Sequence, residues 1–160
     1  MDWKKIYEER STSAEVALKN IPDGGRVVTG HAAGEPSYLL TVMAENKEWF
    51  HNVEICHMVS LGKSEYAQEG MEKHFRHNAL FIGANTKKTV AEGRGDYTPC
   101  FFHEIPRLFE EELPVDVALI SVTPPDENGR VSLGVSIDYT KGAAQNAKIV
   151  IAQVNDQMPF

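Results

Sequence analysis

A short glycine-containing loop, from Gly30 to Gly34, carries the clearest chemical signal in the sequence. It follows the β-branched run Val27–Thr29 and precedes Pro36, which suits the first turn of a helix because its missing N–H is not needed there. Glycine allows backbone angles and close approaches that a side chain forbids. A loop between a strand and a helix start presents unpaired N–H groups and the positive end of the helix dipole. The segment therefore predicts an anion-binding or carbonyl-binding site.

Two side chains in and beside this loop could take part in a reaction. The carboxylate of Glu35 could attack a thioester or ester carbonyl, or it could stabilise the N-terminus of the following helix, which is the interpretation we favour. His31 could donate a hydrogen bond to a substrate carboxylate or carbonyl, or it could bond locally. The segment lacks the Gly-Lys-Ser/Thr sequence of a P-loop and the glycine spacing of a dinucleotide-binding loop. The ligand therefore stays open.

Two further glycines, Gly62 and Gly83, also follow apolar runs. Loops at the carboxyl ends of parallel strands form the usual ligand-binding edge of an α/β protein. We therefore expect Gly30, Gly62 and Gly83 to lie on one edge of a sheet, where bare backbone lets a bulky ligand come close.

Other groups of polar residues give weaker signals. His74 and His77 are three residues apart, as metal ligands can be on a helix, but no third ligand has a suitable spacing, so we expect a solvated pair and no metal site. Asp126–Gly129 lacks the remaining ligands of a calcium loop and predicts a plain turn. Arg94 and Asp96 predict an ion pair that pins their loop.

Length and composition favour one globular domain. The chain has 160 residues, 42% of them hydrophobic, which is enough for a continuous core. Its 16 basic and 23 acidic residues give a net charge of −7 without a basic cluster, so we expect no nucleic-acid partner. No apolar run is long enough to span a bilayer and no secretory signal is visible, so we expect a cytoplasmic protein without a membrane partner. Cys56 and Cys100 predict buried, reduced thiols.

Alternating apolar patterns predict the elements that position these residues. We expect strands at Val27–Thr29, Val53–Leu61, Ala79–Ile82, Val115–Val122, Val131–Val135 and Lys148–Val154, with an extended piece at Tyr97–Phe102. We expect helices from Asp2, from Thr12 with Glu15 as a capping box, from Pro36 to Met43, within Asn85–Gly95, at Pro106–Leu113 and at Tyr139–Asn146, while Glu65–His77 is helical or irregular. This alternation predicts an α/β fold with a mostly parallel sheet covered by helices on both faces.

Five motifs, in order and spacing, resemble the N-terminal domain of the acetyl-CoA hydrolase/transferase family. They are Gly30–Pro36, Gly93–Pro99, Glu104–Pro106, Pro125–Gly134 and Asn155–Pro159. Within that family the chain is most similar to the 4-hydroxybutyrate CoA-transferases. The resemblance covers nearly the whole chain and implies a sheet of the CoA-transferase type.

The resemblance also implies how the protein works. Residues 1–160 would be the N-terminal domain of a two-domain enzyme, commonly a homodimer, with the acyl-CoA site between the domains. The nucleophilic glutamate of the family belongs to the C-terminal domain, so we carry that role to neither Glu35 nor any other acid of this chain, and we expect these residues to be inactive alone. Thioester exchange would need no metal and no cofactor, since CoA is itself a substrate and the partner is a small carboxylate.

From the residues and the resemblance together we expect a substrate-binding wall. Its members share a place in the three glycine-bearing loops: Gly30, His31, Ala32, Gly34, Glu35, Pro36, Gly62 and Gly83. A hydrolase of the same family and a noncatalytic α/β binding domain remain alternatives. A sugar-phosphate isomerase would want a basic residue for the phosphate, and the loop has none after Arg26.

Overall fold

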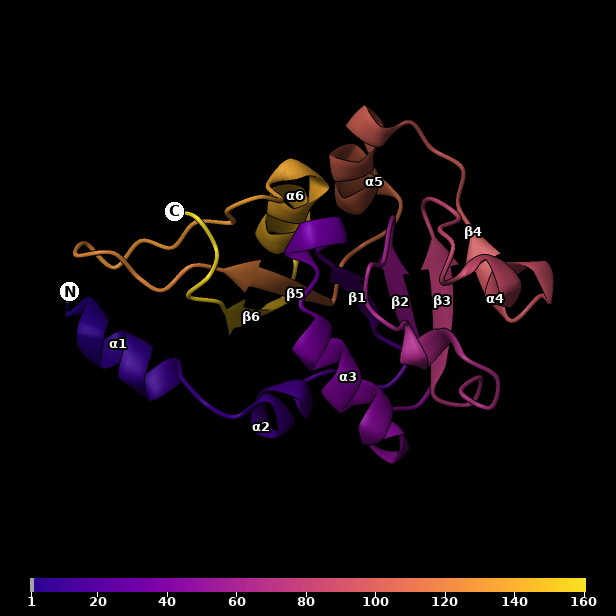
Figure 1. Cartoon of the computed structure of the whole chain (residues 1–160), viewed down its shortest axis with the longest axis horizontal. Helices are drawn as coiled ribbons and strands as arrows, with labels where there is room; N and C mark the ends of the chain where they lie inside the picture. The colour runs from indigo at the N-terminus through magenta and orange to yellow at the C-terminus, as the bar shows by residue number, and fades with distance from the viewer. Residues whose placement is uncertain (1) are drawn as a thin grey trace.

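Six strands form one sheet in the spatial order β4-β3-β2-β1-β5-β6 in the computed structural model, which describes residues 2–160 (Figure 1). The strands are β1 Arg26–Thr29, β2 Val53–His57, β3 Phe75–Ala79, β4 Gly95–Tyr97, β5 Val117–Val122 and β6 Ile149–Val154. All neighbouring pairs are parallel, so the carboxyl ends of the strands share one edge. The strand order reverses beside β1, and such a reversal is where open α/β sheets bind ligands.

Helices cover both faces of the sheet, as the sequence predicts (Figure 1). The helices are α1 Trp3–Arg10, α2 Ala14–Leu18, α3 Ser37–Glu45, α4 Lys87–Ala91, α5 Ile105–Glu111 and α6 Asp138–Asn146. Four short 3-10 turns lie in the connecting segments: η1 Ala32–Gly34, η2 Lys47–Trp49, η3 Glu65–Ala67 and η4 Phe102–Glu104. Helices α2 and α3 pack on one face, and α5 and α6 pack on the other.

The core is split by the alternation of side chains along each strand. Val27 packs with Leu18 and Met43 on the α2 and α3 face, whereas the next residue, Val28, packs with Phe109 and Tyr139 on the α5 and α6 face. All six residues of β5 are buried. A parallel strand covered on both faces needs apolar residues at every position, which explains the unbroken apolar run of β5.

The third strand lies earlier in the chain than predicted. It occupies Phe75–Ala79 instead of Ala79–Ile82, within and after a segment that we expected to be helical or irregular up to His77. Its centre is polar, and this hides the strand from a hydrophobicity pattern. Arg76 is exposed, while His77 points to the other face of the sheet, where it is buried against His57 and Tyr66.

Two predicted strand segments are loops instead. Val131–Val135 forms no strand, because Gly134 adopts a left-handed backbone with a φ of +58° that interrupts an extended chain. The second strand ends at His57 and not at Leu61, so residues 58–61 belong to a loop. The β6 strand is correctly predicted, but it is an edge strand and four of its five apolar residues are exposed.

Helix starts differ from the predictions by one residue. The hydroxyl of Ser13, and not that of Thr12, caps α2 by accepting a hydrogen bond from the Val16 N–H at 3.4 Å. Helix α3 begins at Ser37, with Pro36 at the preceding cap position. Among the described residues, no helix has the length and apolar character that a membrane crossing requires.

Candidate active site at the carboxyl edge of the sheet

Three loops meet at the carboxyl edge of β1, β2 and β3, and we call residues 30–36, 58–64 and 80–86 the loop rim. The carboxylate of Glu35 accepts hydrogen bonds from the N–H of Leu61 at 2.8 Å and of Gly62 at 3.2 Å. The amide of Asn85, from the third loop, donates to the carbonyl oxygens of Ser60 at 3.2 Å and of Gly62 at 2.7 Å. Hydrogen bonds between side chains and backbone therefore join the three glycine-bearing loops, which lie together at this edge of the sheet as predicted.

Close packing explains two of the glycines in the first loop. A Cβ on Gly30 would lie 2.5 Å from the carbonyl oxygen of Gly34, and a Cβ on Gly34 would overlap the Cβ of Ser136. Neither position has room for a side chain. Gly83, in contrast, faces open space, so packing does not explain its glycine.

Glu35 has a structural partner that the sequence does not reveal. Its carboxylate binds the Leu61–Gly62 backbone and makes no capping hydrogen bond to α3, so any support that it gives to the helix N-terminus comes from its charge alone. A Cβ on Gly62 would come within 2.5 Å of Glu35 Oε1. Gly62 therefore leaves the space in which the carboxylate sits.

His31 is held by a local hydrogen bond, one of its two predicted roles. Its Nε2 lies 2.9 Å from Asp138 Oδ2, and the hydroxyl of Ser136 donates to the same oxygen at 2.9 Å. The ring packs against Tyr139 and Phe102, with ring centroids 4.9 Å and 6.0 Å away. Burial alone would raise the pKa of the Asp138 carboxyl, but the hydrogen bonds from His31 and Ser136 outweigh it and hold that pKa below its usual value.

Only some N–H groups of the first loop are free to bind a ligand. The N–H of Gly30 donates to the Leu119 carbonyl at 2.9 Å, that of Ala32 to the Val59 carbonyl at 2.8 Å, and that of Gly34 to the His31 carbonyl at 2.9 Å. Within residues 2–160, the N–H groups of His31 and Ala33 have no protein acceptor. Ala33 is exposed and was not among the predicted site residues. The sequence alone does not show which N–H groups form hydrogen bonds within the folded protein.

A buried polar cluster lies on the α3 face next to the loop rim. Nε2 of His57 hydrogen-bonds to the hydroxyl of Tyr66, and the rings of His57 and His77 lie 4.5 Å apart. Burial lowers the pKa of both histidines, for His57 well below its usual value and with help from the nearby His77. Both rings are therefore neutral at pH 7.

The predicted solvated pair of histidines was wrong. His74 and His77 are both buried, and their Nδ1 atoms donate to the carbonyl oxygens of Phe50 and Ile55, each at 3.0 Å. They lie at and within β3, where residues three apart face opposite sides, so they do not share a helix face. No group of three metal-ligating side chains occurs in the described part of the chain.

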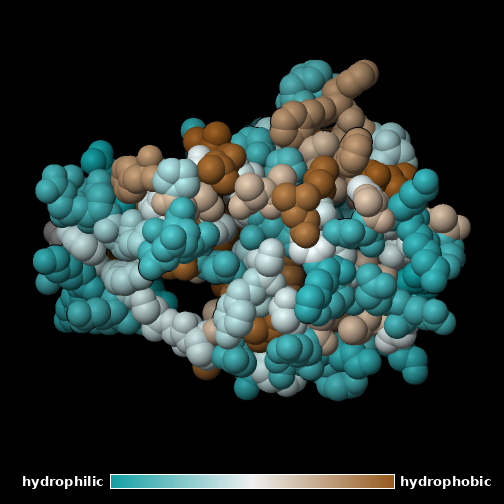
Figure 2. Space-filling view, in the orientation of Figure 1, coloured by the Kyte–Doolittle hydropathy of each residue, from teal (hydrophilic) through white to brown (hydrophobic). Residues whose placement is uncertain are grey.

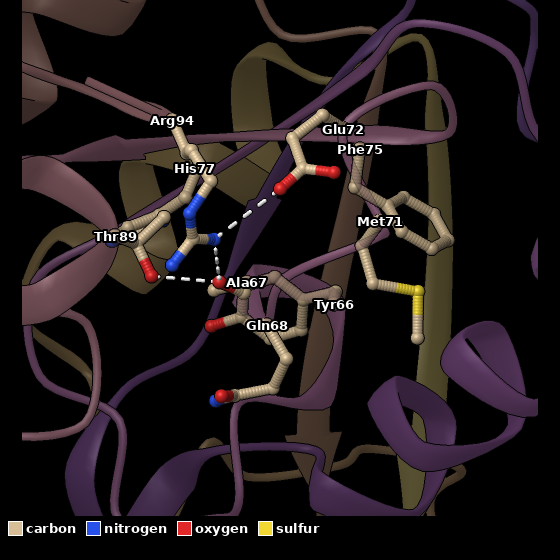
Figure 3. Close-up of a pocket in the computed structure, with 9 residues that line it drawn as sticks. All are labelled: Tyr66, Ala67, Gln68, Met71, Glu72, Phe75, His77, Thr89 and Arg94. Atoms are coloured by element: carbon tan, nitrogen blue, oxygen red, sulfur yellow. Dashed lines mark hydrogen bonds and ion pairs between the residues drawn. The ribbon is translucent and has the colours of Figure 1, made fainter. Parts of the chain in front are cut away.

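The predicted pair of Arg94 and Asp96 does not form. Arg94 instead donates to the Ala67 carbonyl at 3.0 Å and pairs with Glu92 at 2.7 Å and Glu72 at 3.6 Å. Figure 3 shows this arginine in the hollow between η3 and α4. The side chains that line the hollow fill it, so no water molecule fits inside. Arg94 thus pins its loop, as expected, but through other partners, and the hollow is not a ligand site.

Exposed apolar side chains gather around the loop rim. Leu61 and Phe81 belong to it, and Phe101, Phe102 and Ile137 lie on the neighbouring loops before α5 and α6; all five are at least half exposed. Figure 2 shows hydrophobic side chains gathered over the part of the visible face where α5 and α6 lie. Apolar side chains around a polar loop are typical of surfaces that bind a ligand or another domain.

Comparisons with known proteins agree on the kind of domain. A sequence profile described as the acetyl-CoA hydrolase/transferase N-terminal domain matches residues 1–160. The chain is 55% identical over 160 residues to the 4-hydroxybutyrate coenzyme A transferase of Clostridium kluyveri, covering 99% of this chain and 37% of that protein. It is 43% identical over 146 residues to the succinyl-CoA:acetate/propanoyl-CoA:succinate CoA transferase of Fasciola hepatica, covering 88% of this chain and 30% of that one.

Solved structures share the fold. RipA from Yersinia pestis superposes with a TM-score of 0.93 at 27% identity, over 99% of this chain and 39% of RipA. A 4-hydroxybutyrate CoA-transferase from Porphyromonas gingivalis superposes with a TM-score of 0.82 at 35% identity, over 99% of this chain and 36% of that one. The chain therefore spans less than two fifths of the length of each of these relatives.

Proposed function

Because the chain belongs to the acetyl-CoA hydrolase/transferase family, we propose that it forms the N-terminal half of an acyl-CoA:carboxylate CoA-transferase. The names of the relatives include 4-hydroxybutyrate and acetate, and these acids define the proposed substrate class. A C-terminal domain, following residue 160, would complete the site and supply the nucleophilic glutamate. The homodimer expected for this family remains part of the proposal.

The observation that carries the proposal is the pair of free donors beside β1. The N–H groups of His31 and Ala33 lie at the point where the strand order reverses, on a loop held by its neighbours. Backbone donors fixed in advance stabilise the negative charge that develops on a carbonyl oxygen during acyl transfer. We therefore propose that these two groups, and not the N–H of Ala32, bind the thioester oxygen or the substrate carboxylate.

The proposed reaction proceeds in two exchanges at a glutamate of the C-terminal domain. Its carboxylate attacks the thioester carbonyl, the C–S bond breaks, and CoA leaves as a thiolate, which gives an acyl-glutamyl anhydride. The thiolate then attacks the glutamyl carbonyl, releasing the first carboxylate and forming a glutamyl-CoA thioester. The acceptor acid reverses these steps. Thioester exchange is nearly isoenergetic, so the proposed reaction needs no metal or redox group.

Glu35 is not the proposed nucleophile. Its carboxylate already accepts hydrogen bonds from Leu61 and Gly62, which fix it against the neighbouring loop. Both bonds hold the carboxylate against the second loop, and they would have to break before it could move to a substrate carbonyl.

Borohydride trapping in the full-length polypeptide tests the proposal. Incubation with an acyl-CoA followed by borohydride should reduce a glutamyl-CoA thioester to an alcohol and abolish CoA transfer to acetate. Mass spectrometry should place the change on one glutamate outside residues 1–160, and a sample without acyl-CoA should stay active and unmodified. An active enzyme with no modified glutamate, or a modification at Glu35, would contradict the proposal. Release of free CoA at the same rate with and without an acceptor acid would identify a hydrolase instead.

A further inference from the structure

Asp138, the first residue of α6, joins that helix to the first loop of the rim. We propose that Asp138 is a positioning residue for the proposed transfer reaction: it fixes His31 in the tautomer that carries its proton on Nε2 and so holds the loop that presents the His31 and Ala33 N–H groups. This inference rests on the proposed function. Asp138 itself touches no reacting atom.

The carboxylate of Asp138 accepts four hydrogen bonds. Its Oδ2 lies 2.9 Å from His31 Nε2 and 2.9 Å from the Ser136 hydroxyl. Its Oδ1 accepts from the N–H and the hydroxyl of Thr140, each at 3.2 Å. Because a carboxylate offers only acceptors, the nitrogen of His31 that faces it must be the one that carries the proton.

The ring of His31 is packed between aromatic neighbours. Tyr139 and Phe102 pack against it, and Tyr139 is itself fixed because its hydroxyl donates to the Thr29 carbonyl at 3.0 Å. The other ring nitrogen, Nδ1, is buried and has no hydrogen-bond partner among the described residues. A proton on Nδ1 would therefore be buried without an acceptor, so the hydrogen bond from Nε2 to Asp138 is what gives the ring proton a partner.

The loop is tied to α6 at a second point. A Cβ on Gly34 would overlap Ser136, whose hydroxyl donates to Asp138. The bond from His31 and the packing of Gly34 thus hold both ends of the segment that contains the free N–H of Ala33. Donors that must meet a developing charge need this kind of support, because a displacement of about 1 Å can cost on the order of a hundredfold in rate.

The Asp138→Asn substitution separates orientation from packing. The backbone N–H of Thr140 can only donate, so the amide oxygen of the variant must face it, and the NH₂ group must face His31 and Ser136. His31 Nε2 then has to accept, and the proton must move to the buried Nδ1. The substitution is nearly isosteric, so the fold should survive while the tautomer changes.

The tautomer is read by NMR of the full-length polypeptide with ¹⁵N-labelled histidine, using the His31→Gln variant to assign the signal. We expect the Nε2–H form in the wild type and loss of that form in Asp138→Asn. In the same protein, kcat for CoA transfer from 4-hydroxybutyryl-CoA to acetate should fall by about tenfold or more, with a smaller change in KM. Asp126→Asn is the matched control, because Asp126 binds a turn and no histidine, and it should change neither readout.

A double-substitution cycle distinguishes positioning from a general structural role. The side-chain amide of the His31→Gln variant can present either its oxygen or its NH₂ group to residue 138, so Asp138→Asn should cost much less activity in that background. An Nδ1–H tautomer in the wild type, or an unchanged tautomer and kcat in Asp138→Asn, would overturn the inference. A wild-type protein without transferase activity would instead contradict the proposed function. If Asp138→Asn failed to fold, an Nδ1–H tautomer in the wild type would still overturn the link between Asp138 and His31, and an Nε2–H tautomer would support it.

Discussion

The carboxylate of Glu35 occupies the space that a side chain on Gly62 would need. The two residues belong to different loops, and the hydrogen bonds from Leu61 and Gly62 to that carboxylate join the loops that follow β1 and β2. Glu35 therefore links the two loops, and its removal should make both loops more mobile.

We expect Glu35→Ala to expose the backbone of the second loop. Hydrogen bonds to a charged group each contribute about 1.5–3 kcal/mol, so amide hydrogen exchange at Leu61 and Gly62 should accelerate strongly. Exchange in β5, which is distant from this contact, should stay unchanged. Continued protection of both amides would show that the carboxylate does not hold them.

Gly62→Ala should act through the same contact. The added methyl group would displace the Glu35 carboxylate, so the thermal midpoint of the full-length protein should fall in the wild-type background. In a Glu35→Ala background the methyl group meets no carboxylate, and the same substitution should have little effect. Equal losses in the two backgrounds would contradict a direct contact.

Gly34→Val should lower CoA transfer without unfolding the protein. Its side chain would overlap Ser136 and push the first loop away from α6, displacing the free N–H groups of His31 and Ala33. Overpacking of this kind costs about 1–3 kcal/mol, which a stable protein tolerates. Turnover should be measured alongside the circular dichroism spectrum. Gly34→Ala, whose side chain is smaller, should lower turnover less than Gly34→Val, and unchanged turnover in Gly34→Val would remove the loop from the site.

The buried histidines should make the protein sensitive to acid. The pKa values of His57 and His77 lie below the usual value of 6.5. The unfolded chain therefore binds more protons than the folded one below about pH 6.5, and stability is lost as the pH falls from there. Each histidine contributes at most about 1.4 kcal/mol per pH unit.

The thermal midpoint of the full-length protein, measured between pH 7.5 and pH 5, checks this expectation. Removing a buried titrating ring, as in His77→Asn, should flatten the pH dependence, although it also lowers stability at pH 7.5. A substitution at the exposed His103 is the control and should leave the dependence as it is. A midpoint that stays constant down to pH 5 would contradict the prediction.

Arg94 should contribute more to stability than Arg76. The Arg94 side chain is 17% exposed and donates to the Ala67 carbonyl, whereas the Arg76 side chain is 49% exposed and, among residues 2–160, pairs with Asp96 alone. We expect Arg94→Met to cost about 1–3 kcal/mol, since the Ala67 carbonyl loses a charged donor. Arg76→Met should cost less than about 1 kcal/mol because solvent screens an exposed pair. Denaturant unfolding of the two variants compares them, and equal losses would contradict the difference.

The sequence predicts the fold class and the edge of the site, because both depend on local patterns. Apolar runs and glycine endings identify β1, β2, β5 and β6, and an all-parallel sheet brings the glycine loops to one edge. The pattern fails at β3, where Arg76, His77 and Asn78 form an inner strand with a polar centre. It also fails at Val131–Val135, where a β-branched segment is interrupted by the left-handed Gly134.

The details of the site depend on contacts between residues that are far apart in the chain. The fold brings Glu35 to Gly62 and His31 to Asp138, and these residues are far apart in the sequence. No local sequence pattern therefore predicts either contact. The sequence therefore predicts that the first loop binds a ligand. It does not reveal that the Ala32 N–H donates to the Val59 carbonyl while the Ala33 N–H has no acceptor among residues 2–160.

The dependence of the first loop on α6 also bears on protein synthesis. The Gly30 N–H needs the Leu119 carbonyl, and His31 and Gly34 need Asp138 and Ser136, all of which leave the ribosome long after the loop itself. A nascent chain that ends before α6 therefore lacks the partners that shape its ligand-binding loop. The first loop should therefore take its final shape late during translation, once α6 has emerged.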